Sequence, residues 1–247
     1  MNKRLLAPII VTGLAISACG GPETISTPKT VQQAADDFIA TYGCKVPEVP
    51  ITMVDFRDMF PDKIGALGAT TLKGVFVNTN SSLDVQQSVA THEAMHACTD
   101  VSSHTVFEKP FQLDPVTLAT SSIGFRIILD GSTPDQGNDM QQVFVIEEGI
   151  VEWVSAATPN YRPSEDYSPL TQLTANIAKL RGLSREEIVD MHQNDDIIGF
   201  VALVYGIDRE AVTDFEFSDL VFMYQGAFYE RYVPTVEELD FQLNYGK

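Results

Sequence analysis

The ten residues VATHEAMHAC, at positions 89–98, contain two of the four histidines of the chain, spaced four apart around a glutamate. The surrounding sequence LDVQQSVATHEAMHACT has neither Gly nor Pro, so it predicts one uninterrupted helix. On such a helix His92 and His96 are separated by one turn plus about 40°, and both imidazoles point the same way. They can therefore share one metal ion. Glu93 lies about 100° round the helix from His92, where it can reach a water molecule beside that ion without binding the ion itself.

The other residues around this motif are uncharged: Val89, Ala90, Ala94, Met95, Ala97 and Cys98. The pattern resembles the extended signature of zincin metallopeptidases, in which a Val or Thr stands three residues before the first His and uncharged residues fill the gaps. This resemblance implies that His92 and His96 bind Zn²⁺ and that Glu93 is the catalytic general base. The alternative is a charged helix surface with two solvated histidines, because a bare HExxH also occurs by chance.

A catalytic zinc site needs a third protein ligand and an open position for water. Ser102 occupies the position of the third histidine of metzincins, which excludes that branch. Further on, Glu148 and Glu152 stand four apart in NDMQQVFVIEEGIVEWVSAA, on one face of an expected helix. The pair resembles the gluzincin arrangement, which implies that Glu148 is the third zinc ligand and that Glu152 orients a zinc-bound histidine. A solvated, charged helix edge is the alternative.

Two neighbours of Glu148 bear on this assignment. Glu147 lies about 100° away, on the face of Val143 and Val151, so it is expected to contribute little to the zinc site. Gly149 costs about 0.5–1 kcal/mol relative to Ala inside a helix, which is explicable if another helix approaches closely at this point.

The stretch FMYQGAFYERYV, residues 222–233, resembles a late gluzincin helix in which a tyrosine stabilises the oxyanion. The match is imperfect, because Tyr224 stands two residues before Gly226, whereas the tyrosine of the family usually stands three before the glycine. Tyr224 is the candidate that this resemblance implies, and aromatic packing of a C-terminal helix is the alternative. His104 is a second candidate donor. His192, in the polar sequence SREEIVDMHQN, is expected on the surface.

The first residues predict an export signal. Lys3 and Arg4 precede the apolar run LLAPIIVTGLAI, which is too short to span a bilayer. The following ISACG resembles the bacterial lipobox, which implies that Cys19 receives a lipid and becomes the first residue of a chain anchored to a membrane in the cell envelope, on its extracytoplasmic side. An ordinary signal peptide or a buried N-terminal helix is the alternative. The expected divisions are a signal peptide at 1–18, a tether at 19–29 and a zincin-like metallopeptidase domain at 30–247.

Two cysteines remain in such a mature chain, Cys44 and Cys98. An even number of cysteines in an exported, oxidising setting favours a disulfide. Cys98 lies about 200° round its helix from His96, so it faces away from the expected zinc ion. We therefore expect a Cys44–Cys98 bridge, with two unpaired buried thiols as the alternative.

The charge of the chain excludes one class of partner. It carries 34 acidic and 16 basic residues, a net charge of -18. This charge repels phosphate backbones, and no basic cluster offsets it, so nucleic acid is excluded as a partner.

The order of the sequence patterns predicts an α+β, zincin-like fold. An amphipathic helix at 30–43 and a strand at 50–56 precede the alternating sequence GATTLKGVFVNT, which is typical of a hairpin or of two adjoining edge strands. This small N-terminal sheet is expected to pack on the HExxH helix, with the GVFVNT edge free to pair with a substrate strand. A mainly helical C-terminal half follows, with helices expected near 169–181, 184–193, 196–205 and 217–232.

These patterns together predict a membrane-anchored, extracytoplasmic, zinc-dependent peptidase that acts on a peptide or protein substrate. The alternative from another class is a non-catalytic zinc-containing lipoprotein that serves as a binding or docking module. Glu93 distinguishes the two, because a site that only binds metal has no use for a free carboxylate beside the water. A third alternative, a structural helix without metal, would be recognised by its lack of zinc.

Overall fold

The computed structural model of the chain describes residues 29–46, 48–59, 65–71, 74–99, 104–130 and 142–245. The N-terminal part, up to residue 99, consists of α1 (Lys29–Tyr42), β1 (Ile51–Val54), α2 (Phe56–Met59), β2 (Gly68–Thr71), β3 (Gly74–Asn78) and α3 (Leu83–Cys98). The C-terminal part, from residue 104, consists of β4 (Thr105–Asp114), β5 (Thr117–Ile123), β6 (Arg126–Leu129), β7 (Gln142–Val143), α4 (Val145–Ser155), α5 (Ser168–Arg181), α6 (Arg185–Gln193), α7 (Ile197–Tyr205), a 3₁₀ turn (Arg209–Ala211), α8 (Asp214–Glu230) and α9 (Val236–Tyr245). This mixture of helices and small sheets confirms the α+β class.

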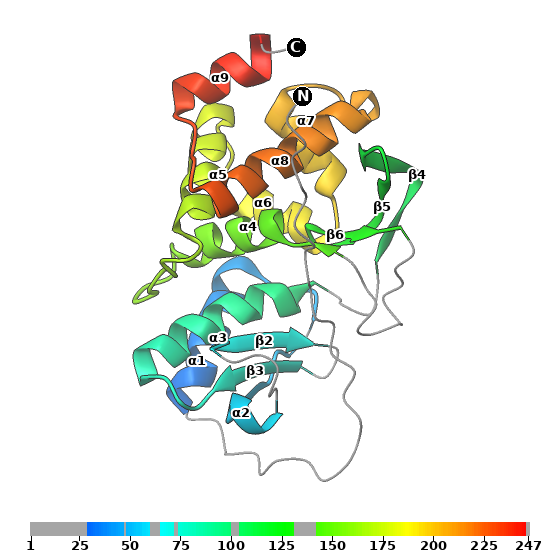
Figure 1. Cartoon of the computed structure of the whole chain (residues 1–247). Helices are drawn as coiled ribbons and strands as arrows, with labels where there is room; N and C mark the ends of the chain where they lie inside the picture. Colours follow the sequence, from blue (N-terminus) through cyan, green and yellow to red (C-terminus); the bar gives the residue numbers. More distant parts are fainter. Residues whose placement is uncertain are drawn as a thin grey trace.

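The N-terminal sheet has the strand order β1-β3-β2, with β1 parallel and β2 antiparallel to β3. The hairpin predicted from the alternating sequence is therefore confirmed. Val75 and Val77 of β3 belong to the same core as Ala90 and Ala94 of α3, so the sheet packs on the HExxH helix. The expectation that GVFVNT forms a free edge is wrong, because β3 is the central strand. The edge next to α3 is β2 (Figure 1).

A second sheet, of strands β4-β5-β6-β7 in antiparallel order, lies between the two helical regions of the sequence. It was not among the sequence predictions. Its inner side packs on α8, where the rings of Phe111 and Phe217 stack at a centroid distance of 4.5 Å. The C-terminal part is therefore mainly helical, as predicted, but its helices enclose this additional sheet.

The predicted helices of the C-terminal part correspond closely to α5, α6, α7 and α8. Their ends have local causes. Ser184 and Glu187 form a capping box at the start of α6. Gly182 and Gly206 end α5 and α7 with φ of 68° and 64°, a left-handed conformation that glycine adopts without strain. No helix among the described residues is long and apolar enough to cross a membrane.

The helix α4 lies at the centre of the molecule, and every residue from Val145 to Ser155 except Glu148 is buried. Gly149 explains how its neighbours approach so closely. A Cβ at this position would lie 2.8 Å from Tyr224 Cε1 of α8 and 3.1 Å from Leu170 Cβ of α5. The predicted close approach at Gly149 is therefore made by α5 and α8, which pack on the side of α4 away from α3.

A disulfide joins Cys44, just after α1, to Cys98 at the end of α3, with 4.8 Å between the two Cα atoms. The sequence separation is 54 residues, for which the chain-entropy model gives a stabilisation of about 4 kcal/mol. The bridge holds α1 against α3. The lipobox and the proposed tether up to residue 28 lie outside the described residues.

Candidate metal centre

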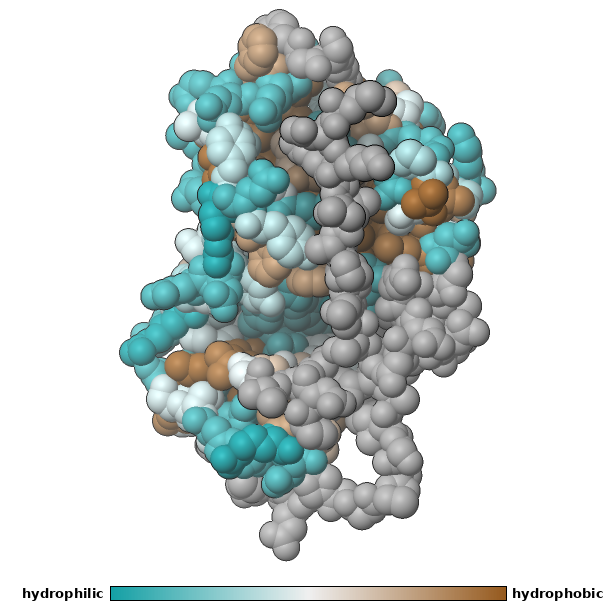
Figure 2. All heavy atoms as spheres, viewed as in Figure 1, coloured by the Kyte–Doolittle hydropathy of each residue, from teal (hydrophilic) through white to brown (hydrophobic). Residues whose placement is uncertain are grey.

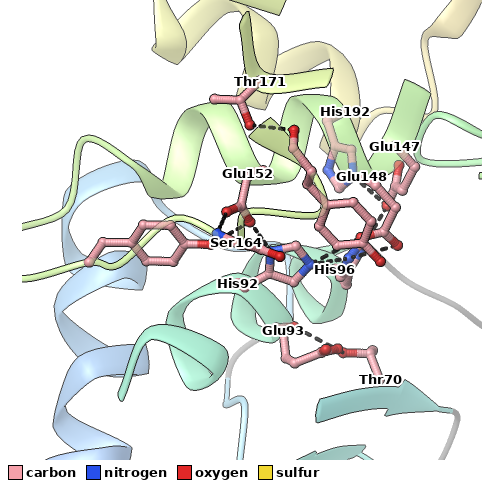
Figure 3. Close-up of polar contacts among 12 residues, drawn as sticks. Thr70, His92, Glu93, His96, Glu147, Glu148, Glu152, Ser164, Thr171 and His192 are labelled. Atoms are coloured by element: carbon pink, nitrogen blue, oxygen red, sulfur yellow. Dashed lines mark hydrogen bonds and ion pairs between the residues drawn. The ribbon is translucent and has the colours of Figure 1, made fainter. Parts of the chain in front are cut away.

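Three side chains from α3 and α4 converge on one point. His92, His96 and Glu148 each direct one ligand atom to it, and these atoms lie within 4.8 Å of one another (Figure 3). His92 Nε2 is 3.2 Å from His96 Nε2 and 3.2 Å from Glu148 Oε2, and His96 Nε2 is 3.6 Å from Glu148 Oε1. The residues that the sequence assigned as metal ligands are thus brought together, although Glu148 follows His92 by 56 positions in the chain.

These separations fit a tetrahedral metal ion. Zinc bonds to nitrogen and oxygen are about 2.0–2.1 Å long, so two ligand atoms at a tetrahedral angle lie about 3.3 Å apart. The 3.2 Å between the two Nε2 atoms and the 3.2 Å from His92 Nε2 to Glu148 Oε2 are close to that value, and the other Glu148 oxygen, Oε1, lies 3.6 Å from His96 Nε2. Both imidazoles direct Nε2 inward and hold Nδ1 on a carboxylate, so the two Nε2 atoms and the carboxylate of Glu148 face each other. Such a set of donors could hold a metal ion.

The charges at this point favour a cation. Burial alone would lower the pKa of His96, but the charge of Glu148 and the hydrogen bonds with Glu147 and Glu148 raise it to about 9. Burial likewise would raise the pKa of Glu148, but His96 and His92 hold it below its usual range. The surroundings of the three side chains therefore stabilise positive charge where they meet.

Glu152 holds His92 from behind. His92 Nδ1 donates to Glu152 Oε2 at 3.0 Å, which leaves Nε2 free to bind a metal ion. The hydroxyl of Tyr161 donates to the same oxygen at 2.6 Å, and the backbone N–H of Ser164 donates to Oε1. Glu152 therefore lies where the sequence resemblance placed it, and residues after α4 fix its carboxylate.

Glu147 holds His96 in the same way, which the sequence did not predict. Glu147 is 2% exposed, and its Oε1 accepts hydrogen bonds from His96 Nδ1 at 2.8 Å and from His192 Nε2 at 2.9 Å. Its Oε2 accepts from the backbone N–H of Phe125 at 2.8 Å. The expectation that Glu147 lies away from both histidines is therefore wrong, and its effect on metal binding stays a prediction. His96 lies one turn further along α3 than His92, so its Nδ1 meets the adjacent face of α4.

The expectation of a surface position for His192 is also wrong, because this side chain is 0% exposed. Its Nε2 contacts Glu147, and its Nδ1 is 3.1 Å from the hydroxyl of Thr99, just after α3. Gly124 makes room for the pair. It has φ of 58°, and a Cβ there would lie 2.8 Å from His192 Nε2 and 3.0 Å from Glu147 Oε2. The turn between β5 and β6 thus closes over this part of the site.

Glu93 lies beside the three converging side chains and is not one of them. It is 9% exposed, and its Oε2 accepts a hydrogen bond from the Thr70 hydroxyl of β2 at 2.7 Å (Figure 3). The same O–H also lies 3.0 Å from the Glu93 carbonyl, so the two oxygens of Glu93 share its proton in a three-centre hydrogen bond. A Cβ at Gly68 would lie 2.7 Å from Glu93 Oε1. The backbone of β2 therefore packs directly on Glu93 and fixes its carboxylate.

Tyr224 lies away from this group. It is 0% exposed on α8, and its hydroxyl shares a hydrogen bond of 2.9 Å with Thr174 of α5. A substrate has no access to this hydroxyl, so the structure does not support the oxyanion role that the resemblance implied. The side chain of His104, the other candidate donor, is exposed and makes no hydrogen bond with any of the described residues.

We expect Glu147→Ala to weaken zinc binding about 10- to 100-fold, because His96 loses the acceptor that orients its ring. Zinc affinity would be measured by competition with a chromogenic chelator, and circular dichroism would confirm that the variant is folded. Glu165→Ala, at an exposed position after α4, is the matched control and should bind zinc as the wild type does. Equal affinity in the two variants would contradict the role of Glu147.

Comparisons with protein-family models, with curated proteins and with solved structures gave no match. Within the described ranges, His92, His96 and Glu148 form the only group of His, Cys, Asp or Glu side chains arranged to hold a metal ion. On the face seen in Figure 2, the surface is hollowed between the N-terminal and C-terminal parts, and hydrophilic residues line the hollow. What the chain does must be inferred from the geometry of these residues.

Proposed function

We propose that this chain is a zinc-dependent peptidase of the gluzincin type. One observation carries the proposal. His92, His96 and Glu148 converge as three metal ligands, and a fourth group, the carboxylate of Glu93, is held beside them without joining them. Three protein ligands and an adjacent free base are the requirements of hydrolytic zinc enzymes. The alternative of a docking module leaves the fixed position of Glu93 unexplained.

A zinc ion held by two imidazoles and one carboxylate would polarise a peptide carbonyl and lower the pKa of a coordinated water towards about 7. The residues of the chain supply the proton transfers. Thr70 holds Oε2 of Glu93, which leaves Oε1 to take the proton of the attacking water. Glu93 then passes this proton to the nitrogen of the leaving amine. Glu152 and Glu147 keep protons on Nδ1 of the two histidines throughout.

The strand β2 is suited to bind an extended peptide. It pairs with β3 along one edge, and no strand among the described residues pairs with the other. Because Gly68 and Thr70 contact Glu93, a peptide added along that free edge would pass close to the base. Backbone hydrogen bonds of this kind bind a peptide with little dependence on its side chains. The free edge of β2 is therefore the proposed peptide-binding edge, in place of the edge that was expected from GVFVNT.

We also propose that the chain acts outside the cytoplasm, anchored to a membrane through a lipid on Cys19. The lipobox resemblance supports the anchor. The disulfide between Cys44 and Cys98 supports an oxidising compartment, because such bridges are rare in the cytosol.

The proposal is tested on the soluble form of the chain that begins after Cys19. We expect one zinc ion per chain by elemental analysis and cleavage of members of a random peptide library, detected by mass spectrometry. EDTA should abolish cleavage, and added zinc should restore it. Zinc without cleavage of any peptide or protein would contradict the peptidase and favour the docking module. Absence of zinc from the folded protein, and failure to take it up, would contradict both.

A further inference from the structure

The segment between α4 and α5 is fixed over the metal centre at several points. Tyr161 and Ser164 both donate to Glu152, as described above. The backbone N–H of Arg162 donates to Ser88 Oγ of α3 at 2.9 Å. The segment therefore contacts both helices that carry the ligands. It ends at Tyr167, the residue that precedes α5.

The ring of Tyr167 lies against a metal ligand. It is nearly parallel to the His92 imidazole, with an interplanar angle of 11° and a centroid distance of 6.1 Å. Phe228 of α8 lies 6.2 Å away from it. The carbonyl of Tyr167 accepts hydrogen bonds from Thr171, from N–H at 2.9 Å and from the hydroxyl at 3.0 Å. These contacts hold the backbone and restrict the ring.

The hydroxyl of Tyr167 differs from those of the two other tyrosines near α4. Tyr161 bonds to Glu152 and Tyr224 to Thr174, whereas the Tyr167 hydroxyl has no hydrogen-bond partner among the described residues. A tyrosine phenol has an ordinary pKa of about 10, so near neutral pH it is a neutral hydrogen-bond donor. The Tyr167 ring lies beside the proposed ligand His92, and its hydroxyl proton is available to a substrate.

We propose that Tyr167 is the oxyanion-stabilising residue of this peptidase. Its hydroxyl donates a hydrogen bond to the carbonyl oxygen of the scissile peptide bond as that oxygen gains negative charge. The proton stays on Tyr167, and no bond of the phenol forms or breaks. The inference rests on the proposed function. It assigns the role to the segment between α4 and α5 and removes it from Tyr224.

The variant Tyr167→Phe keeps the ring against His92 and removes only the hydroxyl. We expect kcat to fall about 10²- to 10³-fold, with KM and zinc affinity close to those of the wild type. Tyr224→Phe is the matched control, because it removes a hydroxyl in the core and should leave kcat unchanged. Tyr161→Phe should instead weaken zinc binding, since its hydroxyl supports Glu152. A kcat of Tyr167→Phe within a few-fold of wild type would overturn the inference.

A second measurement does not depend on hydrolysis. Methylphosphonate carries a tetrahedral anion without any side chain, and its binding to the cobalt-substituted protein can be followed by visible absorption. We expect Tyr167→Phe to bind it about 10- to 100-fold more weakly than the wild type or Tyr224→Phe. Equal affinities, or no binding to the wild type, would overturn the inference. A loss of binding in Tyr167→Phe, in a protein that cleaves no peptide, would support Tyr167 as an anion donor and contradict the peptidase.

Discussion

Replacing Glu93 by Gln should lower kcat by about 10²- to 10⁴-fold and leave one zinc ion per chain. The amide keeps the shape of the carboxylate and can still accept the hydrogen bond from Thr70. It cannot take a proton from water. The proposed ligands His92, His96 and Glu148 are unchanged, so zinc content should be that of the wild type.

Peptide hydrolysis and elemental analysis on the same preparation measure both quantities. Glu108→Gln makes the same chemical change at an exposed position of β4 and serves as the control. If Glu93→Gln retains turnover within a few-fold of the control, another group acts as the base. If it loses zinc as well, Glu93 belongs to the ligands and not to the proton transfers.

Replacing Glu148 by Ala should remove most of the zinc affinity. A zinc site with two histidines and no carboxylate has lost one of its three protein bonds. The loss should exceed those in Glu147→Ala and Glu152→Ala, because these two acids contact Nδ1 of the histidines and leave the donor set intact.

Chelator competition on the three variants gives the order of affinities, and Glu165→Ala again controls for the loss of one negative charge. The expected order places Glu148→Ala weakest, with the other two acids about 10- to 100-fold below wild type. Near-normal zinc affinity in Glu148→Ala would mean that another residue is the third ligand, and the gluzincin assignment would lose its support.

Helical periodicity was enough to predict the elements that carry the candidate metal centre. The spacing of His92 and His96, and of Glu148 and Glu152, depends only on the 3.6-residue repeat, and it fixes which side chains share a face of α3 or α4. The repeat within one helix does not show how a second helix crosses it. Glu147 was misjudged for this reason, since it lies off the face of Glu148 and still meets His96 one turn further along α3.

Residues outside regular helices were harder to predict. Strands β4 and β5 pair with shifts of register, so their alternation of polar and apolar residues is interrupted and the second sheet was missed. Tyr167 belongs to a segment without periodicity, where the direction of a side chain depends on contacts made by distant residues such as Ser88. His192 is polar in sequence and buried in the fold, because Glu147 and Thr99 supply its hydrogen bonds.

The bridge between Cys44 and Cys98 also affects motion within α3. Helix ends fray, and the last turn of α3 contains His96 only two residues before Cys98. If this turn frayed, the His96 side chain would occupy several positions. Metal affinity would then be lower, because the ring would have to be ordered again before it could bind. The disulfide from Cys98 to Cys44, just after α1, opposes this fraying. We therefore expect the last turn of α3 to open less often than an unbridged helix end, and slow amide exchange in this turn would be the corresponding signature.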